Sequence, residues 1–106
     1  MQPRIVIVAY KPKPGKEKGL AALMRTHLPT LQKEGLVTDR PSIIAQAKDG
    51  TFIEVFEWKS AEAIEQAHTN AAVNKMWQAY AEVCDYIPTG QVSEFLNVFS
   101  EFSPFI

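Results

Sequence analysis

Apolar and polar residues recur along the chain with spacings that predict a small set of strands and helices. The β-branched run RIVIVAY at residues 4–10 is typical of a strand buried on both faces. The prolines in KPKPGK end this strand, because proline cannot donate to a sheet ladder. From Lys16 the apolar residues recur every three or four positions, which predicts a helix that Gly35 terminates. Pro29 lies inside this stretch and is expected to kink the helix or loosen its last turn.

A β-hairpin is predicted around Asp49-Gly50, which separates two apolar-rich runs in SIIAQAKDGTFIEVFEW. Asp-Gly favours a two-residue turn whose central residues both have positive φ. Side chains of the second run alternate between two sides, and neither side is wholly polar. Both faces of the sheet are therefore expected to be at least partly covered. Either Glu54 or Glu57 then points at a covered face and needs a partner, which would be Arg40 or a lysine of a second chain.

Two helical segments are predicted after the hairpin, at about 61–68 and about 71–83. Their apolar stripes are out of phase, and the change of phase falls at Thr69-Asn70. Ser60 is the predicted N-cap of the first segment, and Asn70 that of the second. The sequence CDYIP that follows indicates a short last strand.

The order strand, helix, strand, strand, helix, strand is the split βαβ arrangement of a ferredoxin-like α+β domain with an antiparallel sheet. The helices would cover one sheet face, and a symmetric homodimer with its two sheets packed face to face would cover the other. The tail at residues 91–106 holds four of the six phenylalanines. Phe95, Phe99 and Phe102 are spaced as one helical face, and we expect this aromatic tail to pack on the dimer.

Length and charge narrow the class of protein. A chain of 106 residues indicates one domain spanning residues 1–106, and 46% hydrophobic content is typical of a globular protein. A net charge of -1 gives no electrostatic reason to expect nucleic acid or an anionic membrane as partner. The N-terminal apolar run is too short for a signal peptide or membrane span. Cys84 is the only cysteine, which excludes an intrachain disulfide, fits a cytoplasmic location and indicates an inert thiol.

The segment FEWKSAEAIEQAHTNAAVNKMW resembles the antibiotic biosynthesis monooxygenase domain of the dimeric α+β barrel superfamily. The opening VIVAYKPKPGKEKGLAALMRTHLPTLQKEGL and the run from CDYIP through FSEFSPF are similar to the same family, so the resemblance covers nearly the whole chain. It implies a dimeric α+β barrel. The superfamily also includes haem-degrading and isomerising enzymes, so the resemblance constrains the fold more tightly than the activity.

Monooxygenases of this family oxidise phenolic or quinol-type polycyclic substrates with dioxygen and without flavin, haem or metal. The resemblance therefore implies no cofactor. The chemistry needs a base, hydrogen-bond donors for an oxyanion and an apolar pocket between sheet and helices. His68 is the candidate catalytic base. The candidate substrate-binding residues are Asn70, Trp77, Tyr80, His27 and Trp58.

Most of these candidates also have a structural interpretation. His68 lies between two helical segments and could simply hydrogen-bond to backbone groups there. Asn70 is sufficiently explained as an N-cap. Trp77 and Tyr80 are spaced like core residues. His27 lies on the apolar stripe of the first helix, where it either faces the pocket or forms a hydrogen bond near the proline kink.

Haem and metal chemistry are disfavoured by the sequence. The first strand has no asparagine, and Ala67 and Trp77 stand where the resembling haem-degrading branch has tryptophan and histidine. No two histidines and a carboxylate fall at a metal-ligand spacing. Two functions remain: a cofactor-independent monooxygenase-like protein for a small aromatic or quinol-type substrate, or a non-catalytic homodimeric domain that binds a small hydrophobic molecule. A structural dimer without a ligand is the simplest alternative.

Overall fold

The computed structural model describes residues 2–105, and its main strands and helices follow the predicted order. In chain order the elements are β1 (Arg4–Pro12), α1 (Glu17–Met24), α2 (His27–Lys33), β2 (Ile43–Gln46), β3 (Phe52–Trp58), α3 (Ala61–Ala67), α4 (Ala71–Val83), β4 (Cys84–Ile87), the short 3-10 helices η1 (Thr89–Gln91) and η2 (Ser93–Leu96), and β5 (Ser103–Pro104). Within the described residues, no helix has the length and apolar character needed to cross a membrane.

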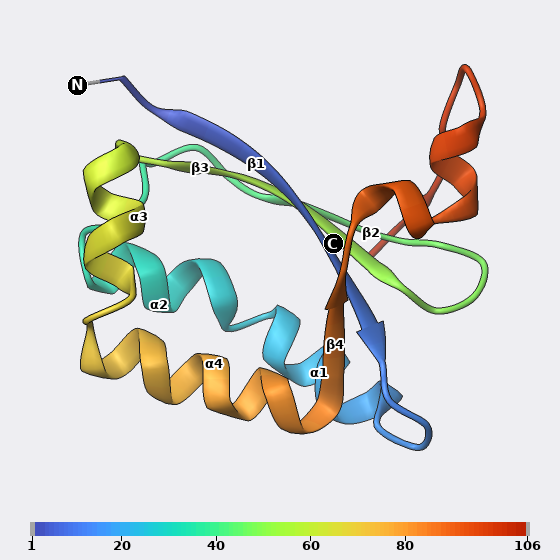
Figure 1. Ribbon diagram of the computed structural model, residues 1–106, viewed down its shortest axis with the longest axis horizontal. Coiled ribbons are helices and arrows are strands. Elements are labelled where there is room, and N and C mark those ends of the chain that lie inside the picture. Colours follow the sequence, from blue (N-terminus) through green and yellow to red (C-terminus); the bar gives the residue numbers. More distant parts are fainter. Residues whose placement is uncertain (1, 106) are drawn as a thin grey trace.

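The strands form one antiparallel sheet in the order β4-β1-β3-β2-β5. The four α-helices lie together on one side of this sheet, and the segment after β4 leaves on the other side (Figure 1). This is an α+β architecture with an antiparallel sheet, compatible with the predicted ferredoxin-like arrangement.

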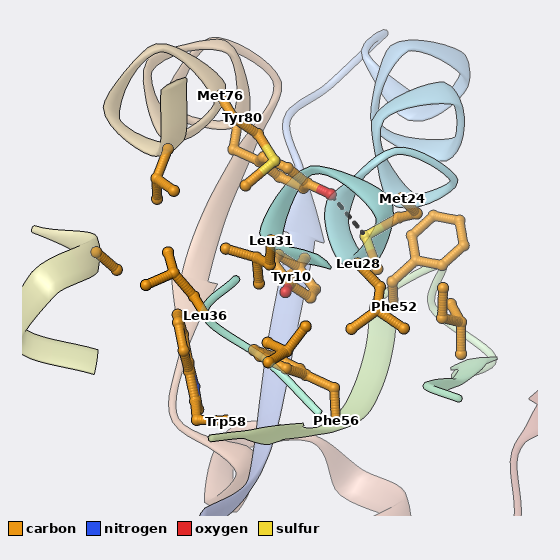
Figure 2. Packing of buried hydrophobic residues seen from close by; sticks show 14 of the residues in the cluster. Tyr10, Met24, Leu28, Leu31, Leu36, Phe52, Phe56, Trp58, Met76 and Tyr80 are labelled. Atoms are coloured by element: carbon orange, nitrogen blue, oxygen red, sulfur yellow. Dashed lines mark hydrogen bonds between the residues drawn. The ribbon is translucent and has the colours of Figure 1, made fainter. Parts of the chain in front are cut away.

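The helix-facing side of the sheet carries the main core. Strand register places Val6 beside Phe56, Val8 beside Glu54, and Tyr10 beside Phe52. Figure 2 shows Met24, Leu28, Leu31, Met76 and Tyr80 of the helices packed towards Phe52, Phe56 and Trp58 of the sheet. The helices α1 to α4 also contribute these buried side chains to the same core: Leu20, Ala63, Ala67 and Val73. Glu54 is the one carboxylate of β1 and β3 on this side, and it is fully buried.

The opposite side of the sheet is only partly covered. At one end, buried Val92 packs with Ala9, Ala47 and Ile53, and Phe95 and Phe102 lie over them. At the other end the sheet is bare: Ile5, Ile7 and Ile43 are 60%, 51% and 64% exposed. The expectation that both faces carry apolar side chains is met, although a single chain covers only one of them fully.

The aromatic tail does not form the helix that its spacing suggested. Only the 3-10 turns η1 and η2 are helical, and Phe99 beyond them is 84% exposed. Phe95 and Phe102 contact each other through a loop, with ring centroids 5.1 Å apart. Phe105 reaches the helix-facing side, where its ring lies 4.8 Å from that of Phe52. The short β5 strand, which pairs with the edge of β2, determines this path.

The hairpin turn differs from the predicted two-residue turn. The Ala47 N–H donates to the Thr51 carbonyl, and the Gly50 N–H donates to the Ala47 carbonyl. The loop therefore has three residues, and only Gly50 has positive φ, at 93°. A three-residue loop that ends with a glycine of positive φ is a common hairpin connection. The Asp49 carboxylate accepts a hydrogen bond from the Thr51 N–H, which lowers the Asp49 pKa and fixes the loop.

Candidate functional site

A break between α1 and α2 places His27 at the centre of the molecule. We predicted one helix kinked at Pro29, but the chain forms two helices separated at Arg25-Thr26. Pro29 explains the position of the break, because its ring would clash with the carbonyl four residues earlier and it has no N–H to donate there. His27 becomes the first residue of α2, and its side chain is 4% exposed.

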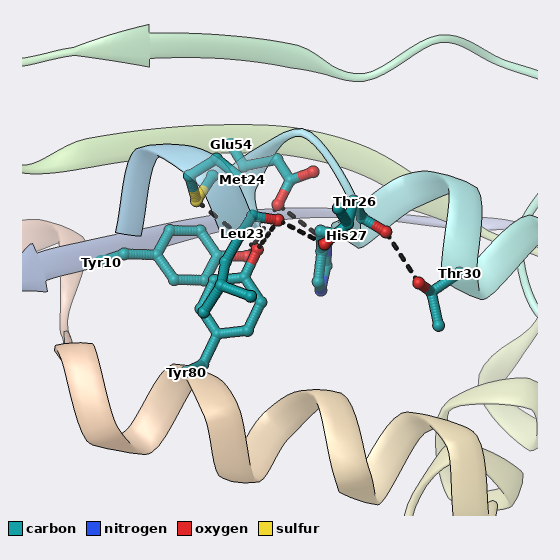
Figure 3. Close-up of polar contacts among 8 residues, drawn as sticks. All are labelled: Tyr10, Leu23, Met24, Thr26, His27, Thr30, Glu54 and Tyr80. Atoms are coloured by element: carbon teal, nitrogen blue, oxygen red, sulfur yellow. Dashed lines mark hydrogen bonds and ion pairs between the residues drawn. The ribbon is translucent and has the colours of Figure 1, made fainter. Parts of the chain in front are cut away.

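At the break the Leu23 carbonyl accepts a hydrogen bond from the Thr26 N–H, and two side chains donate to it as well. The Thr26 hydroxyl donates to this oxygen at 2.8 Å, and the Tyr80 hydroxyl donates to it from α4 at 2.9 Å. Tyr80 therefore joins α4 to the point where the first helix is interrupted (Figure 3). Its ring also lies edge-on to His27, with centroids 5.6 Å apart.

Glu54, His27 and Tyr10 form a buried polar cluster inside this apolar core. The Tyr10 hydroxyl donates to Glu54 Oε1 at 2.7 Å, and His27 Nδ1 lies 2.9 Å from the same oxygen (Figure 3). The ring N–H of His27 is not aligned closely enough with this oxygen to count as a hydrogen bond. The contact becomes an ion pair when His27 is protonated. Glu54 Oε2 is buried without a partner among the described residues.

Burial strongly influences the ionisation of the neighbouring hydroxyl groups. Burial and the adjacent Glu54 carboxylate raise the pKa of Tyr10 well above its usual range, so Tyr10 remains a donor at neutral pH. Burial also raises the pKa of Tyr80, and it raises that of Tyr86 to about 12. A buried carboxylate is costly unless it is paired, and the donor Tyr10 together with the basic His27 provides that pairing for Glu54.

A cavity of about 370 Å³ opens beside this cluster, between the sheet and α4. Its lining consists of His27 and of valines and aromatic side chains from β1, β3, α4 and β4: Val6, Val8, Tyr10, Phe56, Trp58, Trp77 and Tyr86. Both tryptophans of the chain are in this set. The volume lies at the lower end of the roughly 300–1,000 Å³ range of small-molecule sites, and the apolar lining with few polar groups is typical of them.

His27 is the group in this lining that can act as a base near neutral pH. Its Nδ1 faces Glu54, so Nε2 is the ring nitrogen left for a ligand. An imidazole beside a carboxylate is a common arrangement for general-base catalysis, because the carboxylate stabilises the imidazolium that forms.

The structure brings three of the predicted substrate-binding residues to the cavity. His27, Trp58 and Trp77 line it. Tyr80 is fully buried behind His27 and uses its hydroxyl on the helix break. Asn70 does not line the cavity. Its side chain accepts a hydrogen bond from the Val73 N–H as the predicted N-cap of α4, and it donates to Glu34.

His68 does not point into the cavity, contrary to the orientation expected from its stripe. Its side chain is exposed at the end of α3, where Nδ1 lies 2.9 Å from the Ile64 carbonyl. Its ring contacts the edge of Trp77, with centroids 5.4 Å apart. A turn of backbone between α3 and α4 rotates His68 away from the sheet, so its catalytic role stays a prediction that the geometry does not favour.

Sequence reasoning missed the Glu54–His27 contact. It expected a partner for either Glu54 or Glu57, and Arg40 is in fact the partner of Glu57, with Nε 3.2 Å from Oε1. The available signal was the presence of two ionisable residues on otherwise apolar stripes, one on the first helix and one on the hairpin. Such residues must pair when both stripes are buried.

Comparison of this chain with protein-family models, with curated proteins and with solved structures finds no match. Across residues 2–105, no group of three or more His, Cys, Asp or Glu side chains is placed to hold a metal ion.

Proposed function

We propose that this protein is a cofactor-independent monooxygenase-like enzyme that acts on a small hydroxylated aromatic compound, such as a quinol. The observation that supports this most directly is the aromatic cavity with a single histidine, His27, whose Nδ1 lies 2.9 Å from a buried carboxylate. The proposed base is His27 instead of His68, because only His27 lines the cavity. Apolar walls favour a flat aromatic ligand, and His27 Nε2 accepts the proton of its hydroxyl.

The proposed reaction uses dioxygen as the second substrate. His27 removes the hydroxyl proton, and the resulting electron-rich anion transfers one electron to dioxygen. The two radicals combine to form a carbon-bound peroxide, which takes the proton back from His27. The carbon that carries the hydroperoxide also carries a hydrogen. Loss of this hydrogen as a proton, with cleavage of the O–O bond, releases water and leaves a carbonyl group. One oxygen atom therefore enters the substrate and the other leaves as water. Glu54 stabilises the imidazolium between the two proton transfers, because it lies 2.9 Å from Nδ1.

Oxygen consumption with polycyclic quinols or anthrone-like compounds tests this proposal. The chain has two histidines, so His27→Asn and His68→Ala form a matched pair. Asparagine keeps a donor near the Nδ1 position but removes the nitrogen left for the ligand. We expect His27→Asn to lower the protein-dependent rate by about 100-fold or more, as for loss of a general base, and His68→Ala to keep it. A wild-type protein that consumes no oxygen above the protein-free rate, or a fully active His27→Asn variant, would contradict it.

The second candidate is a non-catalytic homodimeric domain that binds a small hydrophobic molecule. The almost wholly apolar lining of the cavity favours it, since such a lining binds ligands without any chemistry. Thermal stabilisation by a quinol that is never consumed would distinguish this function from the enzymatic one.

The proposed functional unit is a homodimer in which two sheets pack face to face as a dimeric α+β barrel. The bare part of the sheet supports this, because Ile5, Ile7 and Ile43 are exposed there and Val55 joins Ile7 to Ile43 across the strands. The exposed tail residues Leu96 and Phe99 would extend the interface. A cytoplasmic location is also proposed, because Cys84 is a free, buried thiol.

A further inference from the structure

The cavity beside His27 has an unusual distribution of charge. The side chains that line it include no Lys, Arg, Asp or Glu of the described residues. One carboxylate nevertheless lies directly behind the wall, because Glu54 contacts both His27 and Tyr10, and these two residues do line the cavity. The positive charge that His27 can carry is therefore matched by an internal anion before any ligand binds.

Glu54 already provides the negative charge that an acidic ligand would otherwise bring to His27. A carboxylate that enters the cavity needs a cation as its partner. The side chain that could provide it is His27, whose Nδ1 already lies 2.9 Å from Glu54 Oε1. The second oxygen of Glu54 is buried and has no partner among the described residues, so no spare donor separates the two anions. Two carboxylates in one site of low polarity repel each other, and one of them must be protonated or leave.

We propose that Glu54 is the specificity-determining residue of this cavity: its buried carboxylate admits neutral hydroxyaromatic ligands and rejects aromatic carboxylates. The proposal rests on the same site as the proposed function and specifies its ligand class. A neutral hydroxyl donates to His27 Nε2 and brings no charge into the cavity. The aromatic rings of such a ligand lie against Trp58 and Trp77.

Calorimetric titration with naphthol, naphthoate and naphthamide at neutral pH tests the proposal. These probes share one ring system, but only naphthoate is an anion. We expect the wild-type chain to bind naphthol and naphthamide at least about tenfold more tightly than naphthoate, the size of one modest charge repulsion. Naphthamide serves as the steric control, because it matches naphthoate in size. Equal affinity for naphthol and naphthoate, rejection of naphthamide together with naphthoate, or absence of binding by all three would overturn the proposal.

Glu54→Gln removes the charge and keeps an acceptor for Tyr10. We expect this variant to gain at least about tenfold in affinity for naphthoate, which then pairs with protonated His27, so that the preference disappears or reverses. The matched control is Glu57→Gln, because Glu57 lies on the same strand but pairs with Arg40 away from the cavity. An unchanged preference in folded Glu54→Gln, or an equal change in Glu57→Gln, would overturn the assignment. If Glu54→Gln fails to fold, the wild-type titrations still test whether the cavity rejects naphthoate.

Binding needs no turnover, so this experiment is independent of the oxygen assay. Selective binding without oxygen consumption would overturn only the proposed enzymatic function. Oxygen consumption without selectivity between naphthol and naphthoate would overturn only the role of Glu54.

Discussion

The most informative residue is Glu54, because a carboxylate in the middle of an apolar strand requires a compensating partner. Tyr10 supplies a hydrogen bond and His27 a potential positive charge. Removing the Tyr10 hydroxyl leaves Glu54 Oε1 without its hydrogen bond, which costs about 1–3 kcal/mol. The proposed role of Glu54 at the cavity would give this cluster a function, because perturbed ionisable groups gather at functional sites.

The buried side chains of Tyr10, Tyr80 and Cys84, together with Tyr86, which is 50% exposed, predict instability at alkaline pH. Burial raises the pKa of Cys84 from 9.0 to about 11 and that of Tyr86 from 10.0 to about 12, and it raises those of Tyr10 and Tyr80 as well. Between the ordinary and the raised values, the unfolded chain loses protons that the folded chain keeps. The free energy of unfolding therefore decreases as the pH rises through this window.

Urea unfolding at a series of pH values measures this effect. We expect the midpoint to decrease steadily from about pH 9 to pH 12. Tyr86→Phe removes one titrating group, so its midpoint should decrease less steeply above about pH 10. A wild-type midpoint that stays level to pH 12, or the same slope in both proteins, would contradict the prediction.

At the scale of elements, the β2–β3 hairpin depends on one glycine. Gly50 has a φ of 93°, a conformation that residues with a side chain adopt only at a cost, whereas Gly90 has an ordinary φ and open space around it. We expect Gly50→Ala to lower the free energy of unfolding by about 1–2 kcal/mol through backbone strain.

Gly90→Ala is the matched control for this substitution. It should change stability by less than about 0.5 kcal/mol, as for a surface position without special backbone geometry. Both variants are compared with wild type by urea unfolding. Equal effects of the two substitutions would show that the strained turn contributes nothing specific.

At the scale of the whole molecule, the partly bare sheet is the dominant feature. The helices cover one face, and the C-terminal segment leaves on the other side (Figure 1). It covers only part of that face and leaves an exposed apolar strip, formed by Ile5 and Ile7 of β1, Val55 of β3 and Ile43 of β2. A monomer in water would keep this strip exposed at a cost proportional to its area. In the proposed dimer, sheet-on-sheet packing with a second copy would remove the strip from water, and each copy would supply the same surface.

Ile7→Lys tests the proposed dimer. Ile7 is 51% exposed at the centre of the strip, so lysine should be tolerated in one chain but should prevent two sheets from meeting. We expect wild type to sediment as a dimer with an interface on the order of 2,000 Å² or more, and Ile7→Lys to sediment as a folded monomer. Ala72→Lys, on the exposed side of α4, should remain dimeric. A folded wild-type monomer at dilute concentration would rule the dimer out.

The sequence by itself determined the helices and strands that depend on contacts between residues close together in the chain. The helices α3 and α4 were predicted with almost the right bounds, because Ser60 and Asn70 each bond to an N–H three residues later and this chemistry is readable locally. The strand β4 was visible in the short run CDYIP, which Pro88 ends. The exact position of the α1–α2 break and the length of the hairpin loop could not be predicted from the sequence. Both depend on how these segments pack against, or pair within, the folded sheet.

The candidate site depended on tertiary structure. His27 and His68 both lie on helical segments next to a break, and nothing in their local sequence decides which one faces a cavity. Packing of α2 against β3 brings His27 to Glu54, while the turn before α4 rotates His68 to the surface. Sequence periodicity shows that a side chain lies on an apolar stripe. Only the packed fold shows which residue it meets there, because that contact joins elements far apart in the chain.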